Sequence, residues 1–267
     1  MKLNYVPLLQ VQRDIQGMPL GMERFRRYLR TLSNQEGTDI ELVPLILMNP
    51  MGKDHVTRLL DALLALDADG IAARAAIEAS AELVGVPGEF NATLVVADDL
   101  KGGGTNRHAY EFDFRFRYGP HGQRPQDVRR FWVTCILWSS EAPAEKTVCE
   151  TMLAAVYRTA YIQRHGHAFT LRDMLIQEGH VMVQAGCSKP TLEDEDLAYT
   201  RDVLVPYLDA NDMRTCIECL FGDAAARTLG FTPRGLSPWA GLALALADAR
   251  ERQQDGTGCR DVGAHAN

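Results

Sequence analysis

The sequence contains no apolar run long enough for a secretory signal or a membrane-spanning helix. Its longest apolar segments, 42–48 and 239–247, are far shorter than the roughly 20 residues that a helix needs to cross a bilayer. The chain also lacks a basic surplus, because its 267 residues carry a formal net charge of −7. This charge argues against general nucleic-acid binding. We therefore expect a cytoplasmic protein that binds no membrane and keeps its six cysteines as reduced thiols.

The motifs that identify several common enzyme classes are missing as well. The sequence has no P-loop, no dinucleotide-binding glycine fingerprint, no nucleophile elbow and no zinc-hydrolase spacing of histidine and glutamate. Cys216 and Cys219 form one Cys-x-x-Cys pair, but a single pair is a weak indication of a metal site. The sequence therefore leaves the cofactor, the metal and the reaction unassigned.

Helical periodicity accounts for most of the chain. The sequence after Ser139 follows a helical pattern, with Thr170 as the cap of one helix. Because residues 254–267 contain almost no apolar side chains, we expect a disordered tail there. No internal repeat or long linker marks a boundary, so we expect one α+β domain over 1–253. Helices are predicted over 22–32, 53–66, 68–84, 143–163, 170–186 and 239–252, with a further one that starts at a capping box of Thr191 and Asp194 and a short one over 212–222.

Three segments in the middle of the chain follow strand patterns instead. Residues 89–98 are rich in β-branched side chains, 109–118 alternate strictly between aromatic and charged residues, and 130–138 are apolar on both faces, as expected of the most covered strand. Short connections between them predict an antiparallel meander, and 41–47 would add a fourth strand. The predicted fold class is therefore α+β: a three-stranded, or with 41–47 four-stranded, antiparallel meander packed against a largely helical C-terminal half. The face of the second strand that would contact these helices consists of Tyr110, Phe112, Phe114, Phe116 and Tyr118.

Glu178 lies near the middle of the apolar stripe of the predicted helix 170–186. An ionised carboxylate in apolar surroundings is costly unless it has a partner or becomes neutral, and Leu or Met would fill the same space without that cost. Glu178 is therefore either a structural partner in a core ion pair or hydrogen bond, or a general acid/base or metal ligand in a site. The neighbouring Gly179 weakens the helix, which favours the site.

The predicted helix 143–163 carries possible companions of Glu178. Glu150, Tyr157 and Tyr161 lie together on the side opposite its apolar stripe. Two tyrosines beside a glutamate can form a wall that faces a ligand, with Glu150 as a weaker catalytic companion. The same side chains can form a second packing face against a neighbouring helix, and this alternative is favoured.

The stretch DDLKGGGTNR (98–107) is an unusual connection between two predicted strands. Glycines let backbone N–H groups converge on an anion, and the flanking lysine and arginine add positive charge. The two aspartates carry the oxygen ligands that a metal beside the loop would need. The alternative is a long hairpin tip with solvated charges. The predicted anion-binding residues are Lys101, Gly102, Gly103, Gly104, Asn106 and Arg107.

Two functions of different classes follow from these features. In the preferred hypothesis the chain is a small-molecule enzyme, in which the glycine loop binds an anionic small molecule and Glu178 supplies acid/base or metal-ligand chemistry. In the alternative it is a non-catalytic binding or adaptor protein, and Glu178 is a structural pair. The protein partner would then contact the charged face of 109–118 or the basic segment 22–32.

Overall fold

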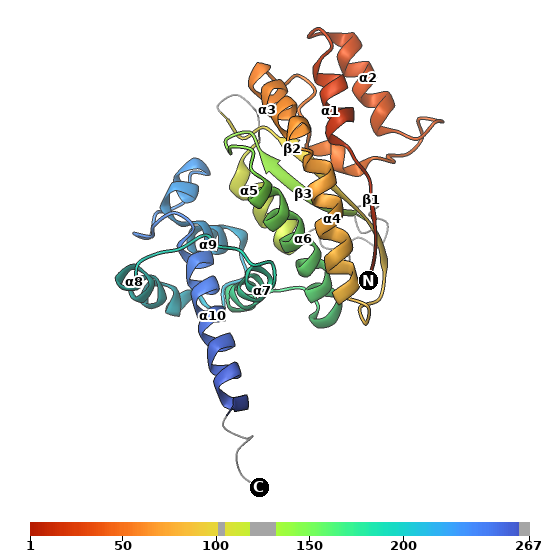
Figure 1. The fold of residues 1–267 in the computed structure, drawn as a ribbon. Coiled ribbons are helices and arrows are strands. Elements are labelled where there is room, and N and C mark those ends of the chain that lie inside the picture. The colour runs from red at the N-terminus through yellow and green to blue at the C-terminus, as the bar shows by residue number, and fades with distance from the viewer. Residues whose placement is uncertain (101–104, 118–131, 262–267) are drawn as a thin grey trace. The chain divides into compact units, whose positions relative to one another are not determined.

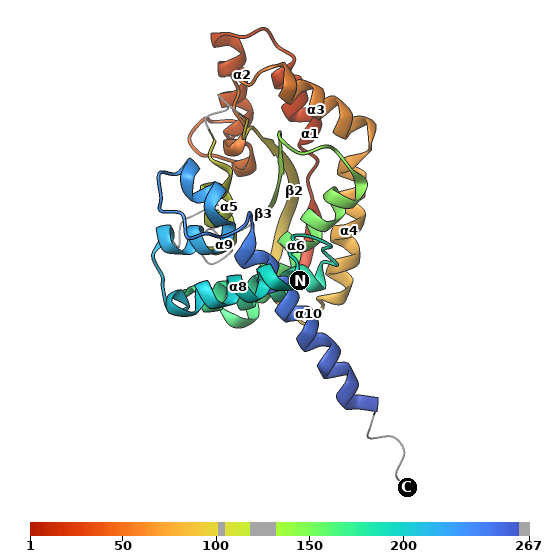
Figure 2. The same cartoon turned by 90° about the vertical axis from the view of Figure 1, so that its left-hand side faces the viewer.

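A computed structural model describes residues 1–100, 105–117 and 132–261 of the chain and is drawn from two sides in Figures 1 and 2. Its internal contacts divide the chain into two compact units, Met1–His167 and Ala168–Asn267. Among the described residues, only the first unit contains strands. In the same ranges, no helix combines the length and the apolar character that crossing a membrane requires. The expectation of one domain over 1–253 stays a prediction.

The first unit is built around a three-stranded sheet in which all strands run parallel (Figure 1). Its strands are β1 (Lys2–Tyr5), β2 (Glu89–Ala97) and β3 (Trp132–Trp138), in the order β1-β2-β3. The predicted strands 89–98 and 130–138 are confirmed within two residues of their ends, but the predicted antiparallel meander is wrong. The middle strand is β2, not the segment 130–138 that was expected to be the most covered.

Helices complete both units, and most of their bounds agree with the helical patterns of the sequence, but the helix predicted over 212–222 continues to Thr228 and the helix Leu9–Gln16 was not predicted. The first unit contains α1 (Leu9–Gln16), α2 (Met22–Leu32), the 3-10 helix η1 (Val43–Leu47), α3 (Asp54–Ala65), α4 (Ala68–Glu82), α5 (Arg107–Phe112), the π-helical turn η2 (Asp113–Arg117) and α6 (Glu145–His165). The second contains α7 (Leu171–Gln184), α8 (Asp194–Leu204), the 3-10 turn η4 (Val205–Tyr207), α9 (Met213–Thr228) and α10 (Ala240–Asp261). Whereas a disordered tail was expected from residue 254, α10 continues to Asp261.

The predicted strand 109–118 is wrong because local helical contacts prevail over the alternating pattern. The Asn106 side chain caps α5 by accepting a backbone N–H at 3.0 Å. Glu111 forms ion pairs with Arg107, four residues before it, at 2.8 Å and with Arg115, four residues after it, at 2.7 Å. Pairs at this spacing stabilise a helix. With 107–117 helical, the strand face of Tyr110, Phe112, Phe114 and Phe116 that was expected to pack on the C-terminal helices does not form, and Tyr118 lies outside the described residues.

The connection between β2 and β3 explains why the sheet is parallel. Two parallel strands need a crossover of a dozen or more residues, and α5 with η2 lies within that crossover. The expected fourth strand at 41–47 is also wrong, since η1 occupies it. Pro44 has a fixed φ and no N–H to donate, which suits the start of a helical turn better than a strand.

Apolar side chains cover both faces of the sheet in the first unit. On one face α3, α4 and α6 pack against Leu94 and Val96 of β2, and in Figure 1 α4 and α6 lie side by side along the sheet. On the other face η1 and the N-terminal helices pack against Val95 and Ala97. Because successive side chains of a strand point to opposite faces, β2 has the continuous apolar sequence of a doubly covered strand.

Gly179 brings α7 and α10 together in the second unit. A Cβ at this position would lie closer than 3.0 Å to the backbone carbonyl oxygen of Ala245 and 3.1 Å from the Cβ of Ala249. Close packing of two helices therefore explains the glycine, which the sequence had presented as a weak point beside a site.

We expect Gly179→Ala to lower the free energy of unfolding by about 1–3 kcal/mol, because α7 and α10 must separate to admit the methyl group. The loss outweighs the roughly 1 kcal/mol that alanine adds to a helix. Urea denaturation followed by circular dichroism measures the change. The exposed Gln184→Ala on the same helix is the control and should stay within about 0.5 kcal/mol of wild type. An equal effect of both substitutions would contradict the packing explanation.

Candidate ligand-binding site

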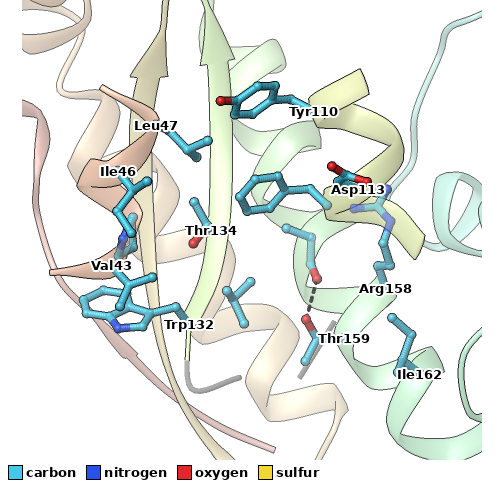
Figure 3. Close-up of a pocket in the computed structure, with 14 residues that line it drawn as sticks. Val43, Ile46, Leu47, Tyr110, Asp113, Trp132, Thr134, Arg158, Thr159 and Ile162 are labelled. Carbon is cyan, nitrogen blue, oxygen red and sulfur yellow. Dashed lines mark hydrogen bonds between the residues drawn. The ribbon is translucent and has the colours of Figure 1, made fainter. Parts of the chain in front are cut away.

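A hollow of about 260 Å³ lies beside β3 in the first unit. Figure 3 shows that its walls come from four segments: η1, the first half of β3, α5 with η2, and α6. Most of the lining is apolar. Its apolar side chains include Val43, Ile46, Phe114, Trp132, Ala155 and Ile162.

The elements around the hollow are held in place by features of the local sequence. Tyr110, Asp113 and Phe114 have the spacing i, i+3, i+4, so one helical face presents all three to the hollow. The helix changes to a π turn at Asp113, a rare geometry that often occurs at functional sites. On α6, Ala155, Arg158 and Thr159 follow the same spacing, and Ile162 lies three residues further on.

A few polar side chains reach the hollow among the apolar ones. In Figure 3, Asp113 and Arg158 extend to the side across from Val43 and Trp132. The Thr159 hydroxyl donates to the backbone carbonyl of Ala155 at 2.9 Å, which leaves its oxygen able to accept. An apolar hollow with a small number of polar groups is the usual character of a small-molecule site.

A second polar cluster lies at the carboxyl ends of β2 and β3. Because Ala97 pairs with Trp138 in the parallel register, the residues that follow each strand are neighbours. The Asp98 side chain is 3% exposed and accepts hydrogen bonds from Ser139 Oγ at 2.6 Å and from His55 Nε2 at 2.7 Å. Parallel sheets bind ligands most often at this edge.

The order of these three groups differs from that of a hydrolytic triad. In a triad the histidine lies between serine and aspartate and takes the serine proton, whereas here the carboxylate of Asp98 lies between Ser139 and His55. Burial would raise the pKa of Asp98, but the hydrogen bonds from Ser139 and His55 outweigh burial and place the pKa below its usual value. The ionised Asp98 therefore ties two strands to α3, and among the described residues the Ser139 hydroxyl donates to the carboxylates of Asp98 and Asp99, not to a histidine.

Arg107 connects this cluster to the helix that lines the hollow. Its guanidinium contacts Glu111 at 2.8 Å, Glu141 at 2.5 Å and Asp99 at 3.9 Å, and it stacks 5.4 Å from the centre of the Trp138 ring. Burial lowers the pKa of Arg107, but the charges of Glu111 and Glu141 outweigh it and raise the pKa overall. These contacts fix α5, whose other residues form one wall of the hollow.

The predicted anion-binding residues are described only in part. Lys101, Gly102, Gly103 and Gly104 lie outside the described residues. Asn106 caps α5, and the contacts of Arg107 among the described residues include three carboxylates. The anion-binding role of these six residues stays a prediction.

Tyr157, Tyr161 and Glu150 of α6 contact other residues of the first unit. Tyr157 donates a hydrogen bond to Glu82 of α4 at 2.6 Å, which supports the alternative of a packing face. Burial and then the bond to Glu82 raise the pKa of Tyr157 to about 12. The Tyr161 ring centre lies 4.5 Å from that of His165, and Glu150 lies 3.7 Å from Lys146. None of these three residues lines the hollow.

Glu178 is completely buried in α7, as its position in an apolar stripe predicts. The side chain of Gln177 donates to it at 3.2 Å, so the carboxylate has at least one polar neighbour within the second unit. Glu178 belongs to the second unit, whereas Glu150 and residues 98–107 belong to the first. A catalytic role for Glu178 and Glu150 stays a prediction.

No group of three or more His, Cys, Asp or Glu side chains within the described ranges is arranged to hold a metal ion. Cys216 and Cys219 are buried in α9 as free thiols. Burial raises the pKa of Cys219 to about 12, which keeps it protonated and a poor metal ligand.

The residues of the hollow were missed by sequence reasoning, although one signal could have indicated them. Tyr110, Asp113 and Phe114 share a face only if the segment is helical, and the Arg107, Glu111 and Arg115 spacing favours a helix. Nothing in the sequence indicates that η1 and Trp132 meet this face.

Comparisons of the chain with family models, with curated proteins and with solved structures found no match. The function is therefore argued from the geometry of the site alone.

Proposed function

We propose that the first unit binds a small molecule, which places an apolar ring in the hollow beside β3. The observation that carries this proposal is the hollow of about 260 Å³, lined by apolar side chains from four segments. An apolar cavity of about 150 Å³ is large enough to hold benzene, so this one accommodates a larger ring system. Apolar burial in such a pocket favours binding, and the few polar groups orient the ligand.

The polar groups restrict which ligands fit. A hydroxyl or amide on the ligand finds acceptors and donors at Asp113, Thr159 and Arg158, whereas a fully apolar ligand forms no hydrogen bond with these groups. The proposed ligand class is therefore a mono- or bicyclic ring with one neutral polar substituent.

Titration calorimetry with 2-naphthol tests the proposal. We expect wild type to bind it with a Kd of about 0.1–1 mM, as is usual for a ligand of this size. Ala155→Leu adds three carbon atoms inside the hollow and should weaken binding at least tenfold, while the melting temperature stays the same or rises. The matched control is Ala154→Leu, since Ala154 precedes Ala155 on α6 and lies outside the lining.

Three results would contradict the proposal. Wild type fails to bind 2-naphthol, Ala155→Leu binds it as tightly as wild type does, or Ala154→Leu loses affinity to the same degree. Circular dichroism of both variants confirms that each is folded before titration.

The anionic ligand of the glycine loop and the protein partner of the adaptor hypothesis stay predictions. We also propose a cytoplasmic location, a reducing compartment in which disulfides are rare; none of the five described cysteines forms a disulfide.

A further inference from the structure

The second unit has a pocket of its own between the end of α8, α9 and the loop that follows α9. It encloses about 570 Å³ and is lined by Asp202, Tyr207, Arg214, Glu218, Thr232 and Arg234, together with apolar side chains of valine and proline. Two arginines, one buried carboxylate and one aromatic ring therefore face the same space.

Glu218 organises the pocket. It is 1% exposed, and its carboxylate accepts the backbone N–H of Thr232 at 2.9 Å and Nε of Arg214 at 3.0 Å, while Arg234 pairs with its second oxygen. Arg214 and Glu218 are four residues apart on α9, so the helix itself aligns this pair. One buried negative charge thus holds two guanidinium groups, and with the exposed Asp202, which also lines the pocket, the four charged side chains sum to zero.

The two guanidinium groups are fixed by further contacts. Arg234 lies over the ring of Tyr207 at 3.9 Å, and Arg214 lies 5.6 Å from the ring of Phe231 and donates to the Thr232 hydroxyl at 2.5 Å. Rings and guanidinium planes in these arrangements attract each other. The arginines are therefore held in position before any ligand arrives, which reduces the entropic cost of binding.

One donor in this pocket has no acceptor. Nε of Arg234 is buried and, in the part of the chain that the structure describes, forms no hydrogen bond. A buried donor without a partner is costly, and an acceptor oxygen from a ligand would remove that cost. Arg214 is about half exposed, so its remaining N–H groups are accessible from the same side.

We propose that this pocket binds an organic carboxylate, whose anionic group contacts Arg214 and Arg234 and whose flat body lies against the apolar wall. A monoanion that contacts the two guanidinium groups adds one negative charge to this neutral set, whereas a phosphate dianion adds two beside Asp202. The smaller repulsion favours the monoanion. Guanidinium groups bind carboxylates with two parallel hydrogen bonds, which gives the selectivity over neutral analogues.

Titration of the full chain with sodium benzoate, followed by calorimetry, tests this site. We expect benzoate to bind wild type and benzamide, its neutral analogue, to bind at least about tenfold more weakly. Arg214→Gln should weaken benzoate binding by about tenfold or more, and it leaves Glu218 with the Thr232 N–H and Arg234 as partners. The matched control Arg227→Gln, on the same helix and paired with Asp223, should bind as wild type does.

The variant Ala155→Leu separates this site from the hollow of the first unit, because it should leave benzoate binding unchanged. The proposal is overturned if wild type binds no benzoate, if benzamide binds equally well, or if Arg214→Gln and wild type have the same affinity. Tighter binding of inorganic phosphate than of benzoate would contradict the choice of a carboxylate. A loss of benzoate affinity in Ala155→Leu would place the ligand in the first unit instead.

Discussion

Replacing Gly222 by alanine is expected to destabilise the second unit by about 3–5 kcal/mol. Gly222 has a φ of 78° and interrupts α9 with a kink. A Cβ there would lie closer than 3.0 Å to the backbone carbonyl oxygen of Ser237. The chain around Ser237 is held at the kink by two backbone bonds, from Trp239 to Phe221 at 2.9 Å and from Asp223 to Leu236 at 3.1 Å, so it cannot move aside without losing them.

Urea denaturation of Gly222→Ala and wild type measures this effect. Gly85→Ala is the control, because a Cβ at Gly85 meets nothing within 4 Å and its φ is ordinary. The control should change stability by less than about 1 kcal/mol. If Gly222→Ala unfolded at the same urea concentration as wild type, the kink and the chain crossing over it would be wrong.

Removing the carboxylate of Asp98 is the second change with a large expected effect. Asp98→Ala removes the acceptor of His55 and the shorter of two hydrogen bonds that Ser139 donates, and it should cost about 2–4 kcal/mol at pH 7. Because the pKa of Asp98 is lower in the folded chain than in the unfolded one, ionised Asp98 stabilises the fold above the unfolded pKa of about 3.9. This contribution is lost as the pH falls through the folded pKa.

The difference between wild type and Asp98→Ala should therefore be largest near pH 7 and shrink progressively below about pH 4. Urea titrations at several pH values measure it, and Asp14→Ala, an exposed residue of α1, is the control with little expected change at any pH. A difference that stays constant down to about pH 2 would contradict the role given to the ionised carboxylate.

Helices of this chain could be predicted wherever the apolar period and the end signals agree. Thr170 and Asp173 form a reciprocal cap at the start of α7, and the 22–32 helix has the predicted bounds. Segment 107–117 could not be assigned in this way, because alternation favours a strand while the spacing of Arg107 and Glu111 favours a helix. The ion pair between Arg107 and Glu141 further stabilises the helical conformation of this segment. The sequence does not reveal this contact, because Glu141 is distant along the chain.

The candidate site was harder to predict than the fold. Burial of Glu178 follows from helical periodicity alone and is confirmed. The hollow depends on the parallel pairing of β2 and β3, which brings Trp132 to the same space as η1 and α6. An antiparallel pairing of the strands would not bring Trp132 beside η1 and α6. The site therefore could not be located from single segments of the sequence.

The most direct test of the proposed function is a crystal structure of the protein soaked with 4-iodophenol, with anomalous scattering used to locate the iodine. The proposal predicts an anomalous peak inside the hollow, between Trp132 and Ile162, with the hydroxyl directed toward Asp113 and Arg158. An empty hollow at saturating 4-iodophenol, or iodine bound only elsewhere on the molecule, would contradict it.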